Sequence, residues 1–355
     1  MTFTRTVLGL IGGAALSALA VGGAFAQEVT LKLHQFLPAQ AVVPSQILDV
    51  WADNVEAQSQ GRIKVERYAA MALGGTPPEL MDQAIDGIAD VVWAVVGYTP
   101  GRYRTTEVFE LPFSMNDARS TSCAFWKMFD EHMADGEFAD LKIIGTWVHG
   151  PGMLHTADPV ETPEDLAGMK IRGGSVLVNK LLERVGATPV GMPVPAVPEA
   201  LAKGVIDGTT IPWEVTYALK VPELVHNHTE FEGPALYTLT FVLAMNKDVY
   251  EGLSDENKAV IDANSGLAFS VFAGGVMEDA DAPARQIAVD LGNRIITISR
   301  QEAEGWKAIT EPIYAEWAGE MNAIGKDGQA LIDESRKLME QCAADMASID
   351  TYGAE

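Results

Sequence analysis

Short apolar, β-branched runs alternate with amphipathic segments along this chain from Val29 onward. Four runs in the first part of the chain have the length of a single strand: 29–33, 63–67, 90–95 and 141–147. Between the first two, Ile47, Trp51 and Val55 recur at intervals of four residues, which places them on one face of a helix. Strands that alternate with helices in this way predict α/β units with largely parallel sheets.

Three segments carry the signature of a helix start, which is a Thr or Ser followed three residues later by an acid. They are Thr76-Pro77-Pro78-Glu79, Thr162-Pro163-Glu164-Asp165 and Ser299-Arg300-Gln301-Glu302. The hydroxyl can accept from an amide of the first turn while the acid reaches back to the cap residue. Each segment is therefore predicted to open a helix.

A second series of strands and helices follows Gly150-Pro151-Gly152. It comprises a strand ending at Arg172, a helix over 175–185, an Ala-Leu helix ending at Gly204, and strands over 205–211 and 295–298. The β-rich run 237–246 could cross back to the first unit. From Ser254 an uninterrupted helix is predicted to at least Asp281, and at about 1.5 Å per residue it is long enough to span both units.

The first residues have the pattern of an export signal. Arg5 precedes an apolar, Gly- and Ala-rich run from Val7 to Val21, and Ala24-Phe25-Ala26 is a small-x-small cleavage site. No second stretch of about 18 apolar residues follows. We therefore expect a periplasmic protein, cleaved after Ala26, that is not itself inserted into a membrane.

The two cysteines and the negative net charge limit the possible covalent cross-links and binding partners. Cys123 and Cys342 can form one disulfide in an oxidising compartment, but the sequence leaves their pairing open. The 355 residues carry 49 acids against 25 Lys and Arg, for a formal net charge of −24. This negative charge argues against nucleic acid as a partner, because nucleic acid is itself a polyanion. An anionic ligand would meet a repulsive overall field, so a local cation must capture it at short range.

Arg172 is the candidate for that cation. It ends the Lys-Ile-Arg strand after the Thr162 helix start, and the turn Gly204-Val205-Ile206-Asp207-Gly208 follows some thirty residues later. A guanidinium at a strand end is a rigid, two-pronged donor for a carboxylate or similar oxyanion. Pairing with a neighbouring acid is the alternative for any single Arg.

The chain resembles the solute-binding subunits of tripartite ATP-independent periplasmic (TRAP) transporters. The matching segments are Leu73-Gly74-Gly75 with Glu79, and 86–90, 111–113, 162–172, 186–190 and 201–208, in order over about residues 29–300. The resemblance implies a two-lobed periplasmic binding protein fold, with hinge strands and a long helix spanning both lobes. It also implies that an interlobe cleft closes on one small organic anion. The protein would then deliver this anion to membrane permease subunits, which are driven by an ion gradient. Such proteins are not enzymes and need no cofactor or metal. In this family an Arg at the position of Arg172 usually clamps the ligand carboxylate.

This resemblance sets the expected domains. Lobe I comprises 27–149 plus 238–277, and lobe II comprises 150–237 plus 278–310. The signal peptide is 1–26, and 311–355 form C-terminal helices that pack on the lobes.

The sequence departs from the family pattern at the expected ligand site. Thr209, Thr210 and Ile211 stand where many members have Gln-Glu-Asn, and Ala196-Val197-Pro198 replace a Glu-Val-Tyr segment. Gly152 falls near the place of a second Arg found in some relatives. His149 and His155 are the nearby groups that could donate instead.

Aromatic residues near predicted strand ends complete the expected site. Trp213 follows Pro212 directly after the Asp207-Gly208 strand, so we expect it and Ile211 to face the ligand. Phe36, Trp93, Tyr98 and Trp147 are further candidates, although large aromatic residues often belong to the core. Such a wall favours an apolar or aromatic monocarboxylate over a polyol, whose hydroxyls would need buried partners.

Glu214 is the last candidate. It would receive a ligand amine or help to hold Arg172, and the alternative is an ordinary acid in the first turn of a helix.

Two other classes of function stay open at this point. His226-Asn227-His228, with Glu223 and Glu230 nearby, has metal-like spacing, but no third ligand is dictated, and an exported metal-dependent hydrolase is the weaker alternative. No Gly-x-Ser-x-Gly elbow or phosphate loop supports an enzyme. A ligand-sensing protein for a sulfonate, zwitterion or polar acid would use the same cleft.

Overall fold

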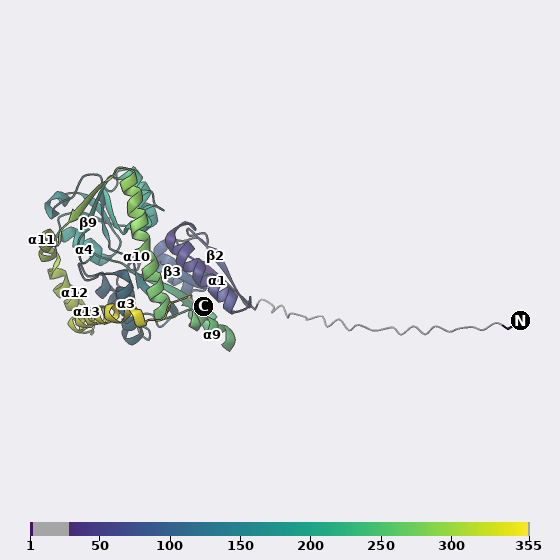
Figure 1. Cartoon of the computed structure of the whole chain (residues 1–355). Helices are drawn as coiled ribbons and strands as arrows, with labels where there is room; N and C mark the ends of the chain where they lie inside the picture. The colour runs from purple at the N-terminus through teal and green to yellow at the C-terminus, as the bar shows by residue number, and fades with distance from the viewer. Residues whose placement is uncertain (3–27, 354–355) are drawn as a thin grey trace.

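The computed structural model describes residues 28–353 and the first two residues of the chain (Figure 1). The expected signal peptide, 1–26, therefore lies outside the described residues apart from those two. In the described part no single helix is long and apolar enough to span a membrane; one bent pair of helices, 255–263 with 267–290, meets the length and composition criteria together.

A five-stranded sheet, in the order β2-β1-β3-β10-β4, forms the first lobe. β1 pairs in parallel with β2 and β3, while β10 runs antiparallel to β3 and β4. The strands are β1 Val29–His34, β2 Ile63–Tyr68, β3 Val91–Val95, β4 Leu141–Val148 and β10 Thr240–Asn246. Its helices are η1 Val43–Leu48, α1 Asp49–Gln58, α2 Leu80–Ile85, α3 Ala118–His132 and α8 Lys247–Glu251. The predicted alternation of strands and helices is confirmed here.

A six-stranded sheet, in the order β11-β9-β5-β8-β6-β7, forms the second lobe. The strands are β5 Met153–Thr156, β6 Lys170–Gly173, β7 Thr188–Gly191, β8 Gly208–Ile211, β9 Asn227–Phe231 and β11 Arg294–Ile298. Its helices are α4 Val176–Arg184, α5 Val197–Ala202, α6 Trp213–Thr216 and α7 Val221–Leu224.

Short 3-10 helices occur along the whole described chain. They are η2 Pro77–Glu79, η3 Val96–Tyr98, η4 Arg104–Glu110, η5 Pro163–Leu166, η6 Val194–Ala196 and η7 Met346–Ser348.

Two segments cross between the sheets. β4 leads through Gly150 into β5, and the run 237–246 returns from the second sheet to the first, as predicted. Tyr237 forms an antiparallel bridge with Gly152, and three residues later β10 begins between β3 and β4. The fold is therefore two-lobed α/β, while the exact lobe boundaries given above remain a proposal.

The predicted helix from Ser254 to Asp281 is not continuous, so that expectation was wrong. It is broken into α9 Asp255–Ala263 and α10 Leu267–Asp290, which are bent by 42°. Gly266 lies between them with φ +96°, a conformation that side-chain-bearing residues rarely adopt and that ends a helix. Of these two helices, α10 is the one that spans the lobes, since it packs on α3 and β4 of the first lobe and on α6 of the second (Figure 1).

The C-terminal segment consists of three helices, α11 Arg300–Thr310, α12 Pro312–Ala323 and α13 Gly328–Asp345. α13 packs on α3, and a disulfide joins Cys123 to Cys342 across this contact. All three predicted capping boxes are present, at Thr76, Thr162 and Ser299.

Candidate ligand-binding site

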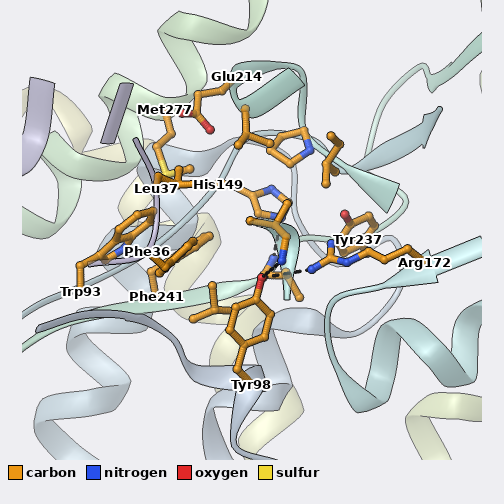
Figure 2. Close-up of a pocket in the computed structure, with 16 residues that line it drawn as sticks. Phe36, Leu37, Trp93, Tyr98, His149, Arg172, Glu214, Tyr237, Phe241 and Met277 are labelled. Carbon is orange, nitrogen blue, oxygen red and sulfur yellow. Dashed lines mark hydrogen bonds between the residues drawn. The ribbon is translucent and has the colours of Figure 1, made fainter. Parts of the chain in front are cut away.

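A cavity lies between the two lobes, and the empty space in it, including open solvent at its mouth, is about 390 Å³ (Figure 2). Its walls come from both sheets, the crossing segments and α10. The lining residues are Phe36, Leu37, Trp93, Val95, Tyr98, His149, Arg172, Val194, Ile211, Pro212, Glu214, Val215, Tyr237, Leu239, Phe241 and Met277.

Arg172 is the cation of this cavity and is only 1 % exposed. Its side chain extends from β6 into the cavity, where Nε donates to Met192 O at 2.9 Å and one terminal nitrogen donates to Thr210 O at 3.0 Å. The other terminal nitrogen donates to the Tyr98 hydroxyl at 3.1 Å. Among the residues that the structure describes, no carboxylate lies within ion-pair distance of this guanidinium. Two of its five N–H groups are left for another acceptor.

Tyr98 is placed to donate a hydrogen bond into the cavity. It belongs to η3, directly after β3, and its oxygen accepts from the backbone N–H of Val194 at 2.8 Å as well as from Arg172. Because both of these contacts use the oxygen as acceptor, the hydroxyl proton can be given to a third group.

Tyr237 supplies a second hydroxyl, which the sequence did not indicate. Its side chain is fully buried, and the hydroxyl faces Thr210 without a hydrogen bond of standard geometry. Burial raises the pKa of Tyr237, so the group stays protonated and acts as a donor. A Cβ on Gly152 would lie 2.3 Å from the Tyr237 ring, so this ring fills the space above Gly152. Gly152 leaves room for the ring, although the sequence alone does not link it to Tyr237.

Stacked aromatic rings form the apolar wall. Phe36 and Trp93 stack with their centroids 4.3 Å apart and an interplanar angle of 20°. Phe241 also lies nearly parallel to Trp93, with the ring centroids 5.7 Å apart and an interplanar angle of 23°. These rings come from the loop after β1 and from the neighbouring strands β3 and β10. A wall of parallel rings is complementary to a flat, apolar ligand body.

Glu214 is the one acid in the cavity wall. It lies in the first turn of α6, is 3 % exposed, and its Oε1 has no hydrogen-bond partner among the described residues. Its backbone N–H donates to Oδ1 of Asp281 on α10 at 2.7 Å. Burial, and then the nearby Asp281, raise the pKa of Glu214 to about 8. The carboxyl group is therefore protonated at neutral pH.

His149 lines the cavity, but its ring nitrogens are already engaged. Nδ1 lies 2.5 Å from Gly150 O, and the backbone N–H of Leu239 donates to Nε2 at 3.1 Å, which fixes the proton on Nδ1. Burial first, and the charge of Arg172, lower the pKa of His149 to about 4. The ring is thus neutral and contributes shape rather than a donor.

Three expected site residues lie outside the cavity wall. His155 lies with its Nδ1 2.7 Å from Nδ1 of His228 and its Nε2 3.2 Å from Ile211 O. Trp147 stacks behind Phe241 at 6.1 Å. Trp213 packs on Met153, Ala284 and Ala288, and its indole N–H donates to Glu230 at 3.3 Å. Trp213 is the first residue of α6, and its side chain faces α10 instead of the cleft.

The remaining expected residues do lie in the wall, and several further ones join them. Arg172, Ile211, Phe36, Trp93, Tyr98, His149 and Glu214 are brought together as expected. The sequence did not indicate the other lining residues, among them Leu37, Tyr237, Phe241 and Met277. Phe241 and Met277 carry no local signal, because their place depends on how β10 and α10 pack between the lobes.

The expected metal-like spacing does not form a metal site. His228 contacts His155 and Asn293, and His226 contacts Asn293. In the described part of the chain, the one group of residues with suitable spacing is Glu131, His132 and Glu334, none of which lines the cavity.

Comparison with known proteins gives one consistent result. A model of the family "bacterial extracellular solute-binding protein, family 7" matches residues 35–320. A TRAP solute-binding protein from Rhodoferax ferrireducens T118, in complex with copurified benzoate, is 45 % identical with a TM-score of 0.88, and the match covers 90 % of this chain and 99 % of that one.

Two further solved structures are similar. A marine metagenome TRAP protein from an unidentified microbe, specific for aromatic acid ligands and crystallised with 3-hydroxybenzoate, is 44 % identical with a TM-score of 0.87, over 89 % of this chain and 99 % of that one. A TRAP periplasmic protein from Bordetella bronchiseptica with bound (R)- and (S)-mandelate is 28 % identical with a TM-score of 0.81, over 88 % and 99 %.

Proposed function

The chain belongs to family 7 of the bacterial extracellular solute-binding proteins and is a TRAP transporter solute-binding subunit, and we propose that its solute is an aromatic monocarboxylate bound in the interlobe cavity. Its relatives are transport proteins and not enzymes. Proteins of this family act in the periplasm, and we propose that this one delivers its solute to the membrane permease subunits of its own transporter.

The observation that carries the proposal is the buried Arg172 guanidinium, which has no acid partner among the described residues. Burying an unpaired charge costs several kcal/mol, so such a group is retained where a ligand supplies the opposite charge. A carboxylate placed there would receive the two remaining N–H groups of Arg172 and the hydroxyl protons of Tyr98 and Tyr237.

The aromatic stack supports the choice of ligand body. Phe36, Trp93 and Phe241 offer flat faces and few hydrogen-bonding groups. A sugar acid would bury several hydroxyls against these rings, and each unpaired hydroxyl would cost about 1–3 kcal/mol. The similar structures with benzoate, 3-hydroxybenzoate and mandelate support the same class of solute.

Calorimetric titration and thermal unfolding with four ligands test the proposal. We expect benzoate to bind more tightly than glucuronate by at least about 100-fold and to raise the melting temperature selectively, because it stabilises only the native state. Cyclohexanecarboxylate tests the need for a flat ring, and benzenesulfonate tests the anion. Tighter binding of glucuronate would refute the aromatic solute, and tighter binding of benzenesulfonate would refute the carboxylate.

A further inference from the structure

We propose that Glu214 is a second recognition group, which binds a hydroxyl substituent on the ligand ring, so that the preferred solute is a hydroxylated aromatic acid and not the unsubstituted one. This inference rests on the proposed function, since it concerns the same cavity and the same ligand class. It assigns to Glu214 a role different from the two that the sequence suggested, which were a partner for a ligand amine and a support for Arg172.

The first observation is that Glu214 is buried in the cavity wall with an unpaired oxygen. Its side chain is 3 % exposed, and its Oε1 has no hydrogen-bond partner among the described residues. The side chains that line the cavity with it include the apolar Leu37, Val215 and Met277. An unpaired buried polar atom costs about 1–3 kcal/mol. A ligand hydroxyl would remove that cost.

The second observation is the position of Glu214 relative to the cation. In Figure 2, Glu214 lies at one end of the group of lining side chains, and the Arg172 guanidinium meets the Tyr98 hydroxyl away from it, near the middle of the group. His149 lies between Glu214 and this meeting point, and Phe36 and Phe241 lie to one side. A ligand that reaches both Arg172 and Glu214 must therefore carry its second polar group away from its carboxylate, across the body of the ligand.

The chemistry of the far end favours a neutral hydroxyl. Asp281 accepts from the backbone N–H of Glu214, and its Oδ2 has no hydrogen-bond partner among the described residues, so two acids lie close together. Burial raises the pKa of both carboxyl groups to about 8, because this end of the cavity disfavours negative charge. A second ligand carboxylate would be disfavoured there for the same reason. Burial holds Glu214 protonated at neutral pH, and a neutral carboxyl group can both donate to and accept from a hydroxyl. An ammonium group would require the ionised form that burial disfavours.

The test is a comparison of ligands across variants, measured by calorimetric titration at pH 7. The ligands are benzoate, 3-hydroxybenzoate, 4-hydroxybenzoate and 3-(aminomethyl)benzoate, and the readout is the ratio of the Kd of benzoate to that of each substituted acid. For the wild type we expect this ratio to be about 10 or more for at least one hydroxybenzoate. In Glu214→Met it should fall to about 1, and in Glu214→Gln, which keeps a donor and an acceptor, it should stay above about 3.

Glu107→Gln is the matched control. Glu107 is another largely buried acid, with its pKa raised to about 7 by burial and the nearby Glu110, but it binds the Trp317 indole and does not line the cavity. This variant should keep the wild-type ratio. Should Glu214→Met not fold, Glu214→Gln and the wild-type ratios still decide the question.

The outcomes separate this inference from the proposed function. If benzoate and both hydroxybenzoates fail to bind, the proposed function is wrong. If benzoate binds but neither hydroxybenzoate binds more tightly, or if Glu214→Met keeps the preference, only the role of Glu214 is overturned. A preference for 3-(aminomethyl)benzoate would also overturn it, because that result would assign Glu214 to a cation.

Discussion

The hydroxyl oxygen of Tyr98 lies 3.1 Å from a terminal guanidinium nitrogen of Arg172, and the two residues belong to different lobes. Tyr98 follows β3 of the first sheet, whereas Arg172 lies on β6 of the second. The same oxygen accepts from the N–H of Val194, also in the second lobe. One hydroxyl therefore joins the lobes and shapes the anion-binding end of the cavity.

Tyr98→Phe should weaken benzoate binding by about 10- to 100-fold. It leaves the Val194 N–H and one Arg172 N–H without their acceptor and removes a donor to the ligand, and each buried unpaired group costs about 1–3 kcal/mol. Calorimetric titration measures the loss. Tyr103→Phe is the control, because Tyr103 is likewise buried, but its hydroxyl has no hydrogen-bond partner among the described residues and its ring stacks on Phe138 away from the cavity. Equal effects of the two substitutions would contradict the role of Tyr98.

Arg172→Met should reduce benzoate affinity by at least about 100-fold. The substitution removes the positive charge while keeping much of the side-chain volume. The free energy of unfolding of the ligand-free protein should change by less than about 2 kcal/mol, because losing a buried unpaired charge offsets the loss of donors to Met192 O and Thr210 O. Denaturant unfolding and titration measure the two quantities. Arg285→Met, which breaks an ion pair with Glu230 outside the cavity, should leave affinity unchanged.

The sequence predicted those parts of the site that local patterns encode. Arg172 was identifiable because it follows a capped helix start and lies near the end of a short strand. Phe36 and Tyr98 were identifiable because each follows a strand of an open α/β sheet, and Trp93 because it lies near the end of one.

What the sequence could not predict depends on contacts between distant segments. Trp213 is adjacent to the cavity residues Pro212 and Glu214, yet its side chain faces α10, because the direction of a helical side chain depends on how the helix packs. The Tyr237 ring fills the space above Gly152, which is 85 positions earlier. The break at Gly266 likewise interrupts a sequence whose helical pattern continues on both sides.

Trp213→Phe should lower stability and spare binding. The substitution opens space in the small cluster with Met153 and Ala288 and removes the donor to Glu230, so we expect a loss of about 1–3 kcal/mol in denaturant unfolding. Benzoate affinity should stay within about threefold of the wild type. Trp93→Phe is the comparison, since Trp93 forms the cavity wall and its replacement should weaken binding. A large loss of affinity in Trp213→Phe would restore Trp213 to the site.

Reducing the disulfide should destabilise the protein without changing its ligand affinity. The bond joins Cys123 on α3 to Cys342 on α13, which are 219 positions apart, and neither helix contributes to the cavity wall. Cross-links that close long loops stabilise by about 2–5 kcal/mol. Urea unfolding with and without reductant measures the difference, and the Cys123→Ala/Cys342→Ala variant should unfold at the same midpoint in both. An unchanged midpoint for the reduced wild type would refute the stabilising role.

The pH dependence of stability should report on Glu214. Its pKa is about 8 in the folded protein, compared with a usual value of 4.5, so the folded state binds a proton more tightly than the unfolded chain. This contribution to stability is fully present below pH 4.5, declines as the pH rises, and is lost above about pH 8. Asp281, whose pKa is also about 8, lies next to Glu214, so the two titrate as a pair. Glu278, whose pKa burial also raises, acts on Asp281 in turn.

We therefore expect the wild type to lose stability relative to Glu214→Gln between about pH 5 and pH 8, with a slope of at most about 1.4 kcal/mol per pH unit. Comparing the two proteins cancels the groups that they share, such as His149. Urea unfolding at pH 5, 6.5 and 8 gives the difference in the free energy of unfolding at each pH. Glu183→Gln, at an exposed position on α4, should follow the wild type in parallel at all three. Parallel curves for the wild type and Glu214→Gln would mean that Glu214 is ionised in the folded protein. Its carboxylate would then repel an anionic ligand, and the neutral recognition group inferred above could not exist.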